Sequence, residues 1–287
     1  MIYVLLLLGV TAVWGWTFVL VKDAISQYPT LPFLALRFAI AFLVMAALVR
    51  RVPDRRVLGV GAVVGLALSA GYLLQTVGLQ STSPGNAGLI TGLFVVFTPV
   101  FERAFGRRLP ARTVVAVVLA LVGIALLAGR PGGVAFGDVL VLGCAVAFSL
   151  HIVLLGRWAP TLPAAPLALV QMVVAAGLFG AAGGAAGQFS APPVAVWPAI
   201  AITGVFASAL AFFIQTWAQS HLAPSRVALI LASEPAWALM FAVLLAGQRL
   251  GAAQAFGAAL VLVAVIGHEA AGAISGRAPA VDRIGQP

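Results

Sequence analysis

Residues 72–101 read YLLQTVGLQSTSPGNAGLITGLFVVFTPVF, and residues 212–241, 140 positions later, read FFIQTWAQSHLAPSRVALILASEPAWALMF. The shift aligns Gln75 with Gln215, each followed by threonine, and aligns the leucine-isoleucine pair of both copies. The chain therefore contains an internal repeat. An odd number of membrane spans in each copy would make the copies antiparallel, which is the architecture of transporters that alternate between two open sides.

The composition indicates an integral membrane protein. Of the 287 residues, 63% are hydrophobic and 8% are charged, with a mean hydropathy of +1.14. Soluble domains carry about a quarter charged residues, and a membrane span needs about 20 apolar residues. Ten apolar runs meet this need, at residues 3–21, 31–49, 57–79, 86–105, 112–129, 138–156, 164–185, 195–219, 225–246 and 252–270.

We therefore predict an all-α integral membrane protein with ten transmembrane helices arranged as two inverted five-helix repeats. The first repeat is expected over residues 1–134 and the second over 135–270, with a disordered cytoplasmic tail at 271–287. The first run has no basic region before it and no small-residue cleavage site, so we interpret it as a retained span and not as a signal peptide.

The basic residues predict the orientation in the membrane. With the amino terminus inside, twelve arginines fall on the cytoplasmic side: Arg50, Arg51, Arg55, Arg56, Arg103, Arg107, Arg108, Arg112, Arg157, Arg226, Arg277 and Arg283. The four on or near the outside are Lys22, Arg37, Arg130 and Arg249. The positive-inside rule then explains the net charge of +9 without a nucleic-acid partner. We expect a multi-pass protein of the plasma membrane (the bacterial inner membrane) with both termini cytoplasmic.

Several segments resemble the EamA-type domain of the drug/metabolite transporter superfamily. They are WGWTFVLVK from Trp14, LRFAIAF from Leu36, GRRL from Gly106 and SEPAWALMFAVLLAGQRL from Ser233. The resemblance implies a ten-helix bundle around a central cavity and the export of small metabolites such as amino acids. The third, fourth, eighth and ninth spans would form most of the cavity, with the fifth and tenth at the periphery.

Three positions depart from the pattern of that family. Arg107 and Gln248 stand where the family usually has glutamate, and Phe148 stands where a tryptophan is expected early in the sixth span. Roles that depend on those acids in the family are therefore not carried over to this chain.

Polar side chains inside the spans are candidates for the substrate site. Gln75 and Gln215 occupy matched positions in the two copies, and a primary amide is costly to satisfy in hydrocarbon, so we assign both to the cavity. Tyr72 lies near Gln75 in the third span and is placed there too. For the serines and threonines we prefer a packing role, because they readily bond their own backbone.

Ionisable residues inside spans are fewer. Glu234, followed by Pro235, lies within the ninth span, where an acid is a functional-site candidate by default. It could bind substrate or carry a coupling proton; the alternative is a protonated glutamate bonded to backbone opened by the proline. His151 could relay protons, although a bonded packing histidine is the commoner case. We interpret Arg37 and the Lys22-Asp23 pair as interfacial.

The remaining assignments concern span ends and small or aromatic residues. Glu102 with Arg103 is expected to form a pair at the cytoplasmic end of its span. Trp14 and Trp237 are assigned to the cavity wall, with lipid-facing packing as the alternative, and Trp237 is three residues from Glu234 on the same helical face. The single cysteine, Cys144, excludes an internal disulfide.

We interpret the chain as a secondary transporter that exports small metabolites. A channel or scaffold is the alternative, and an intramembrane enzyme is disfavoured because no HExxH or GxSxG sequence is present. No GxxxxGK[ST] loop occurs, which argues against ATP hydrolysis by this chain. We expect no cofactor and no metal. The expected partners are a small-molecule substrate, the lipid bilayer and, as a coupling ion, protons; the chain is expected to be a monomer or a homodimer.

Overall fold

The computed structural model describes residues 1–287 except 51, 108, 128–134, 247–250 and 275–287, and the described part is helical without a β-strand. The uninterrupted helices are α1 Ile2–Gln27, α2 Thr30–Leu48, α3 Arg55–Gly78, α6 Ala111–Leu127, α7 Phe136–Trp158, α8 Ala164–Ala185 and α13 Ala252–Ile274. A short 3₁₀ turn, η1 Ala159–Thr161, follows α7.

The other helical segments are interrupted. They are α4 Pro84–Thr91 with α5 Phe94–Ala104; η2 Val194–Val196 with α9 Trp197–Gly204, the π-helical η3 Val205–Leu210 and α10 Ala211–Gln219; and α11 Pro224–Leu231 with α12 Glu234–Ala246.

Local chemistry explains where several helices begin. The Asp54 carboxylate accepts a hydrogen bond from the Val57 amide at 2.8 Å and caps α3. The Ser83 hydroxyl accepts from the Asn86 amide at 3.2 Å, and Pro84 is the first residue of α4. A proline suits this position because its missing N–H would have no helical partner there. Pro224 begins α11 in the same way, so both copies of the repeat start a helix at the aligned proline.

The all-helical membrane class is confirmed. Within the described residues, seven segments are long and apolar enough to cross a membrane, and Ala111–Leu126 and Ala255–His268 are shorter apolar helices. Large apolar side chains face outward along them; Leu5, Leu66 and Ile266 are 60%, 52% and 64% exposed. Such surface is expected to contact lipid. The count of ten spans remains a prediction.

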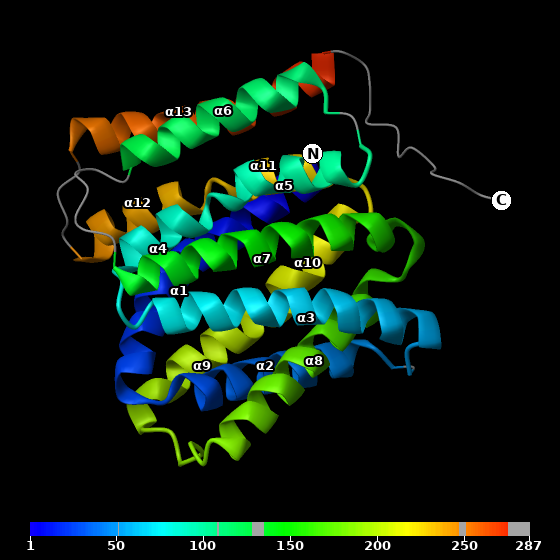
Figure 1. Cartoon of the computed structure of the whole chain (residues 1–287), viewed down its shortest axis with the longest axis vertical. Helices are drawn as coiled ribbons and strands as arrows, with labels where there is room; N and C mark the ends of the chain where they lie inside the picture. Colours follow the sequence, from blue (N-terminus) through cyan, green and yellow to red (C-terminus); the bar gives the residue numbers. More distant parts are fainter. Residues whose placement is uncertain (51, 108, 128–134, 247–250, 275–287) are drawn as a thin grey trace.

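The helices lie side by side in one bundle (Figure 1). α6 packs against α13 along one edge, and α2 packs against α8 and α9 along the opposite edge. Between them, α3 packs against α7 and α8, and α1 packs against α12. The largest buried cluster joins aromatic residues of several helices, among them Phe33, Phe38 and Phe212.

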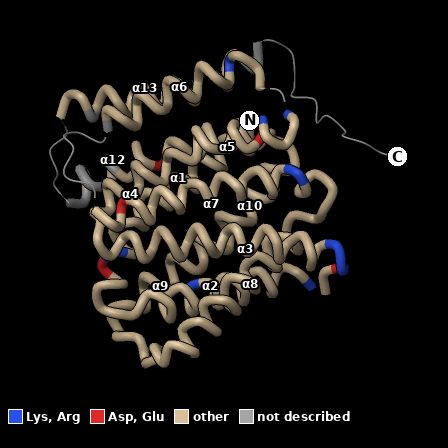
Figure 2. The backbone as a smooth tube through the Cα atoms, in the orientation of Figure 1, with Lys and Arg blue, Asp and Glu red and all other residues tan. Residues whose placement is uncertain are grey.

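Charged residues gather at the ends of the helices, and most of the basic ones lie at the end that carries the amino terminus (Figure 2). Seven of the residues named in the sequence analysis lie outside the described part: Arg51, Arg108, Arg130, Arg249, Arg277, Arg283 and Gln248. The predicted tail also falls outside from residue 275 onward, but its first four residues, 271–274, continue α13 because Ala-rich sequence favours helix.

Candidate functional site: a central cavity between the helices

A cavity lies between the helices, with about 610 Å³ of space between its wall atoms when the part open to solvent is included. Its wall combines aromatic rings with polar side chains from helices far apart in the sequence. Six of the seven predicted site residues line it: Trp14, Tyr72, Gln75, His151, Gln215 and Glu234. The sequence pattern therefore selected residues that the fold brings together.

Trp237 is the predicted site residue that does not line the cavity. Its indole Nε1 is buried without a hydrogen-bond partner, and its Cβ lies next to the backbone of Gly15 in α1. A Cβ built on Gly15 would lie 3.0 Å from that of Trp237. The assignment to the wall rested on the short spacing from Glu234, but this part of Trp237 packs against a neighbouring helix.

Two helix interruptions meet beside the cavity. The first separates α4 from α5 at residues 92–93, and the second separates α11 from α12 at residues 232–233. A Cβ built on Gly92 would lie 3.0 Å from Cγ of Pro235, so the two interruptions are in contact. Glu234, the first residue of α12, lines the cavity next to this contact.

The Glu234 side chain is 4% exposed, and no hydrogen bond or ion pair joins its carboxyl group to another described residue. The alternative interpretation, a carboxyl bonded to the backbone opened by Pro235, finds no such bond in the described part of the chain. An acid placed in this way has its bonding capacity free for a ligand or a proton.

The paired glutamines have different partners. Gln75 Nε2 donates to Thr91 Oγ1 at 3.2 Å, which ties α3 to α4. Gln215 Nε2 donates to Gln219 Oε1 at 3.0 Å, while Gln215 Oε1 is buried without a partner. An unsatisfied buried acceptor is costly, so Gln215 offers a bond that a ligand could complete.

His151 is a bonded packing residue that also lines the cavity. Its Nε2 lies 2.8 Å from Gln171 Oε1, and Gln171 in turn donates to the Leu167 carbonyl at 3.1 Å. The imidazole meets the Phe212 ring edge-on, with 5.8 Å between centroids. These contacts tie α7 to α8 and to α10 beside the cavity.

Arg37 was predicted to be interfacial, and this was wrong. The side chain is 3% exposed and lines the cavity. Its Nε donates to Ser208 Oγ at 2.8 Å, and its Nη2 donates to Tyr72 Oη at 3.1 Å and to the Ala207 carbonyl at 3.4 Å. The sequence could have indicated this, because Arg37 is seven residues after Thr30, the first residue of α2, and therefore about 10 Å along the helix. An arginine two turns inside a span is a functional-site candidate.

The π-helical turn η3 supplies part of this site. Both Ala207 and Ser208 belong to η3, and the Ala207 carbonyl also accepts from Trp14 Nε1 at 2.9 Å. A π-helical turn widens the helix locally and often occurs at functional sites. Here it presents a carbonyl and a hydroxyl toward two cavity side chains.

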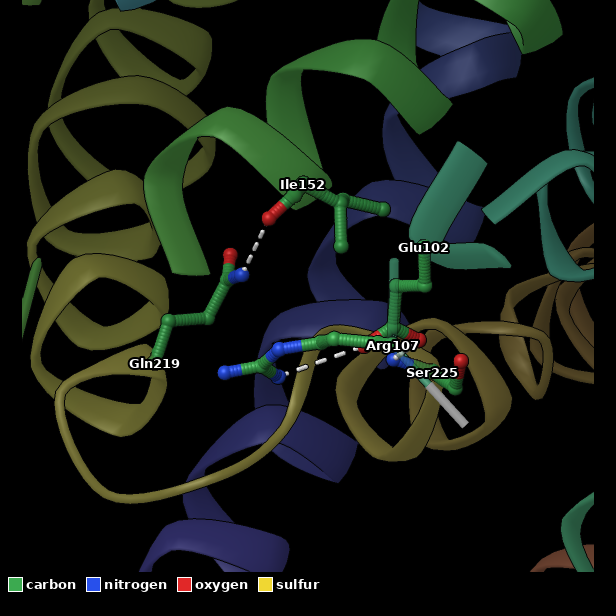
Figure 3. Close-up of polar contacts among 5 residues, drawn as sticks. All are labelled: Glu102, Arg107, Ile152, Gln219 and Ser225. Carbon is green, nitrogen blue, oxygen red and sulfur yellow. Dashed lines mark hydrogen bonds and ion pairs between the residues drawn. The ribbon is translucent and has the colours of Figure 1, made fainter. Parts of the chain in front are cut away.

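Polar contacts connect helices near the arginine-rich end of the bundle (Figure 3). Glu102 at the end of α5 accepts from the Ser225 amide at 2.9 Å through Oε2, and pairs with Arg107 at 3.3 Å through Oε1. Nearby, Gln219 Nε2 donates to the Ile152 carbonyl at 2.6 Å. These bonds join α5 to α11 and α10 to α7.

The ionic partner of Glu102 differs from the predicted one. Arg103 is exposed, and Arg107, five residues from Glu102, approaches the carboxylate because the chain turns after Ala104. Lys22, at the opposite end, donates to the carbonyls of Leu79, Gln80 and Thr82 at 2.5, 3.0 and 3.2 Å. It thereby caps the carboxyl end of α3, which favours a cation.

A family comparison identifies the kind of protein that carries this cavity. The model of the EamA-like transporter family matches residues 1–129 and again residues 135–268. The chain belongs to the EamA-like transporter family. The resemblance seen in the sequence is thus confirmed, and this EamA-like chain is a multi-pass membrane protein related to transporters.

Similar proteins carry transporter names. An "Uncharacterized transporter" of Archaeoglobus fulgidus is 32% identical over 266 residues, which are 90% of this chain and 82% of that protein. The "Uncharacterized inner membrane transporter YedA" of Escherichia coli K12 is 24% identical, over 88% and 86% of the two chains. A solved crystal structure with 22% identity superposes with a TM-score of 0.76 over 94% of this EamA-like chain and 98% of its own, which shows a shared fold.

Proposed function

We propose that this protein is a secondary transporter that exports small metabolites such as amino acids by alternating access. The observation that carries the proposal is that aligned residues of the two repeats line one cavity. The pairs, each 140 positions apart, are Tyr72 and Phe212, Gln75 and Gln215, Thr91 and Leu231, and Phe94 and Glu234. A central site shared by two inverted repeats is the arrangement expected for such a cycle.

The packing of the helices supports the inverted repeats, with 1–134 and 135–270 as the two units. α2 packs against its counterpart α8, and α6 packs against its counterpart α13. The α3–α7 contact corresponds to the contact between α1 and the segment of α9, η3 and α10. The interruptions before α5 and α12 fall at the same repeat position. Interrupted helices next to a central site recur in transporters, where they contribute free helix ends.

The location and orientation rest on charge. The end with most basic residues is assigned to the cytoplasm by the positive-inside rule, together with both termini (Figure 2). A bacterial inner membrane agrees with the name of the Escherichia coli relative. The pair α6 and α13 lies at one edge of the bundle (Figure 1), contributes no described residue to the cavity wall, and is available for a homodimer contact.

The cavity wall suits a substrate with both apolar and polar parts. Rings of Trp14, Phe148 and Phe212 supply apolar surface, and Gln75 and Gln215 supply hydrogen-bonding groups. A mostly apolar pocket with a few placed polar groups is the usual composition of a small-molecule site. Free amino acids with aliphatic or aromatic side chains fit this description best.

The test is counterflow in proteoliposomes, screened over amino acids and related metabolites. A carrier loaded with unlabelled substrate accumulates labelled substrate transiently, whereas a scaffold or an intramembrane enzyme does not, and a channel only equilibrates it. Absence of counterflow for every compound, from correctly folded protein, would contradict the proposed function.

The paired glutamines give the matched variants for this assay. Gln75→Leu and Gln215→Leu each remove amide groups without adding charge, so insertion should survive. Exchange should fall at least several-fold, since a lost hydrogen bond in a dry site costs about 1–3 kcal/mol. Gln188→Leu, in an exposed loop after α8, is the control and should exchange like the parent. Parental exchange by both cavity variants would make the glutamines packing groups.

A further inference from the structure

We propose that Arg37 is the subsite for the carboxylate of the transported molecule, which rests on the proposed transport function and specifies its substrate class. Arg37 lies in α2, a helix that the resemblance does not place among the principal cavity helices. The inference comes from three features of its surroundings: the neutral partners of its guanidinium, the acceptors around it and the charge composition of the cavity wall.

The first feature is that every partner of the buried guanidinium is neutral. Arg37 bonds two hydroxyl groups, of Ser208 and Tyr72, and the carbonyl of Ala207. Its charge also lies over the ring of Tyr72, with 4.5 Å from Cζ to the ring centroid. No carboxylate of a described residue forms an ion pair with it. A buried cation without a counter-ion is costly, so a ligand anion would relieve that cost.

The second feature is the orientation of the guanidinium. The three bonds use Nε and Nη2, and none of them uses Nη1. Arg37 lines the cavity, so the two N–H groups of Nη1 remain available there. Tyr72 and the π-helical turn η3 hold the group through its Nε and Nη2. Arginine binds carboxylates through paired, planar hydrogen bonds, and a guanidinium held in place loses little freedom on binding.

The third feature is the balance of charge in the wall. Among the described residues that line the cavity, Arg37 is the one lysine or arginine and Glu234 is the one acid. A zwitterion offers an opposite charge to each of them. The aromatic residues that line the same cavity supply apolar surface for the rest of the molecule.

The experiment compares matched compounds that differ in one group. For a chosen amino acid, counterflow and thermal stabilisation of the purified protein are measured with the free acid, its amide and the corresponding decarboxylated amine. The parent should exchange the acid at least ten-fold better than the amide and the amine. Inorganic phosphate is included as a competitor, and strong inhibition by it with no acid preference would overturn a carboxylate site.

The variants separate recognition from folding. Arg37→Gln should lose the preference for the acid, and Arg37→Lys should keep part of it, because a point charge remains without the planar fork. Tyr72→Phe and Ser208→Ala retain the guanidinium and should raise the KM for the acid several-fold while the amide is affected less. Arg103→Gln, at an exposed position, is the control and should behave like the parent.

The outcomes distinguish this inference from the proposed function. If the parent exchanges acid, amide and amine equally, it is a transporter in which Arg37 does not recognise a substrate carboxylate, and the inference is wrong. The same conclusion follows if folded Arg37→Gln or Tyr72→Phe protein keeps the full preference for the acid. If no compound of any class exchanges, the transport function itself fails and the inference falls with it.

Discussion

Two glycines of α1 provide a sharp test of the packing next to Glu234. A Cβ built on Gly15 would lie 2.7 Å from the Ala238 amide nitrogen, 3.0 Å from Trp237 Cβ and 3.1 Å from the Glu234 carbonyl oxygen. Two of these atoms belong to the backbone of α12 and cannot move away as a flexible side chain does. A Cβ on Gly9, in the same helix, would have nothing within 4 Å.

The two substitutions therefore differ in a single respect. Gly→Ala within a helix gains about 0.5–1 kcal/mol from reduced backbone entropy, and this gain applies to both positions. Added volume in a packed region costs about 1–3 kcal/mol, and this cost applies to Gly15 alone. We expect Gly9→Ala to be neutral or stabilising and Gly15→Ala to be less stable than it by about 1–3 kcal/mol, roughly a 5- to 150-fold change in the unfolding equilibrium.

The measurement is reversible unfolding of the purified protein in mixed detergent, titrated with a denaturing detergent and followed by tryptophan fluorescence. Transport is measured in parallel, since separating α1 from α12 displaces the start of α12, where Glu234 faces the cavity. Equal stability of the two variants, or a more stable Gly15→Ala protein, would show that α1 and α12 are not as close as described.

Three further predictions concern charge and orientation. Glu234→Gln keeps the size of the side chain but removes its titration. If Glu234 carries a coupling proton, the variant loses substrate accumulation and its pH dependence but keeps substrate exchange; if Glu234 holds the substrate, exchange and binding fall together. Unchanged accumulation, exchange and pH profile would exclude both roles. Glu102→Leu should destabilise the contacts at the arginine-rich end by about 1.5–3 kcal/mol, the value of a buried charged hydrogen bond. Arg107→Gln, whose side chain is 33% exposed, should cost about 0–1 kcal/mol because solvent screens the ion pair. The rate at which a cysteine in the cavity is labelled from the cytoplasmic side measures the effect of each variant, and a larger effect of Arg107→Gln would contradict the role given to Glu102. Cysteines placed at Gln188 and at Gln286, which lies outside the described residues, in a Cys144→Ala background should be labelled by an impermeant thiol reagent on intact cells at Gln188 alone. Equal labelling at both sites, or labelling at Gln286 alone, would contradict the inverted topology.

The sequence predicted the membrane class and much of the cavity for the same physical reason. Hydrocarbon penalises polar groups, so the few that remain inside apolar runs, such as Gln75, Gln215 and Glu234, stand out against their neighbours. The internal repeat added a second criterion, because two glutamines at matched positions are harder to explain by packing alone.

Other features had no equally clear signal. Arg37 was placed at the interface because long basic side chains often reach the headgroups, and only the fold shows that η3 and Tyr72 surround it. The π-helical turn over Val205–Leu210 contains no proline or glycine from which it could have been predicted. The partner of Glu102 depends on the turn after α5, which brings Arg107 to the carboxylate while the adjacent Arg103 faces outward.

The contact between the two helix interruptions has a consequence for how the gene can change. A side chain at position 92 would need the space that Pro235 fills, since a Cβ there would already lie 3.0 Å from the proline ring. A larger residue at 92 therefore favours a smaller one at 235, together with small shifts of the Leu89 carbonyl and Ile124, which lie 3.2 and 3.3 Å from the same Cβ. This contact couples a position of the first copy to a position of the second, and a mutational library that varies both together should be enriched in pairs whose combined volume is conserved.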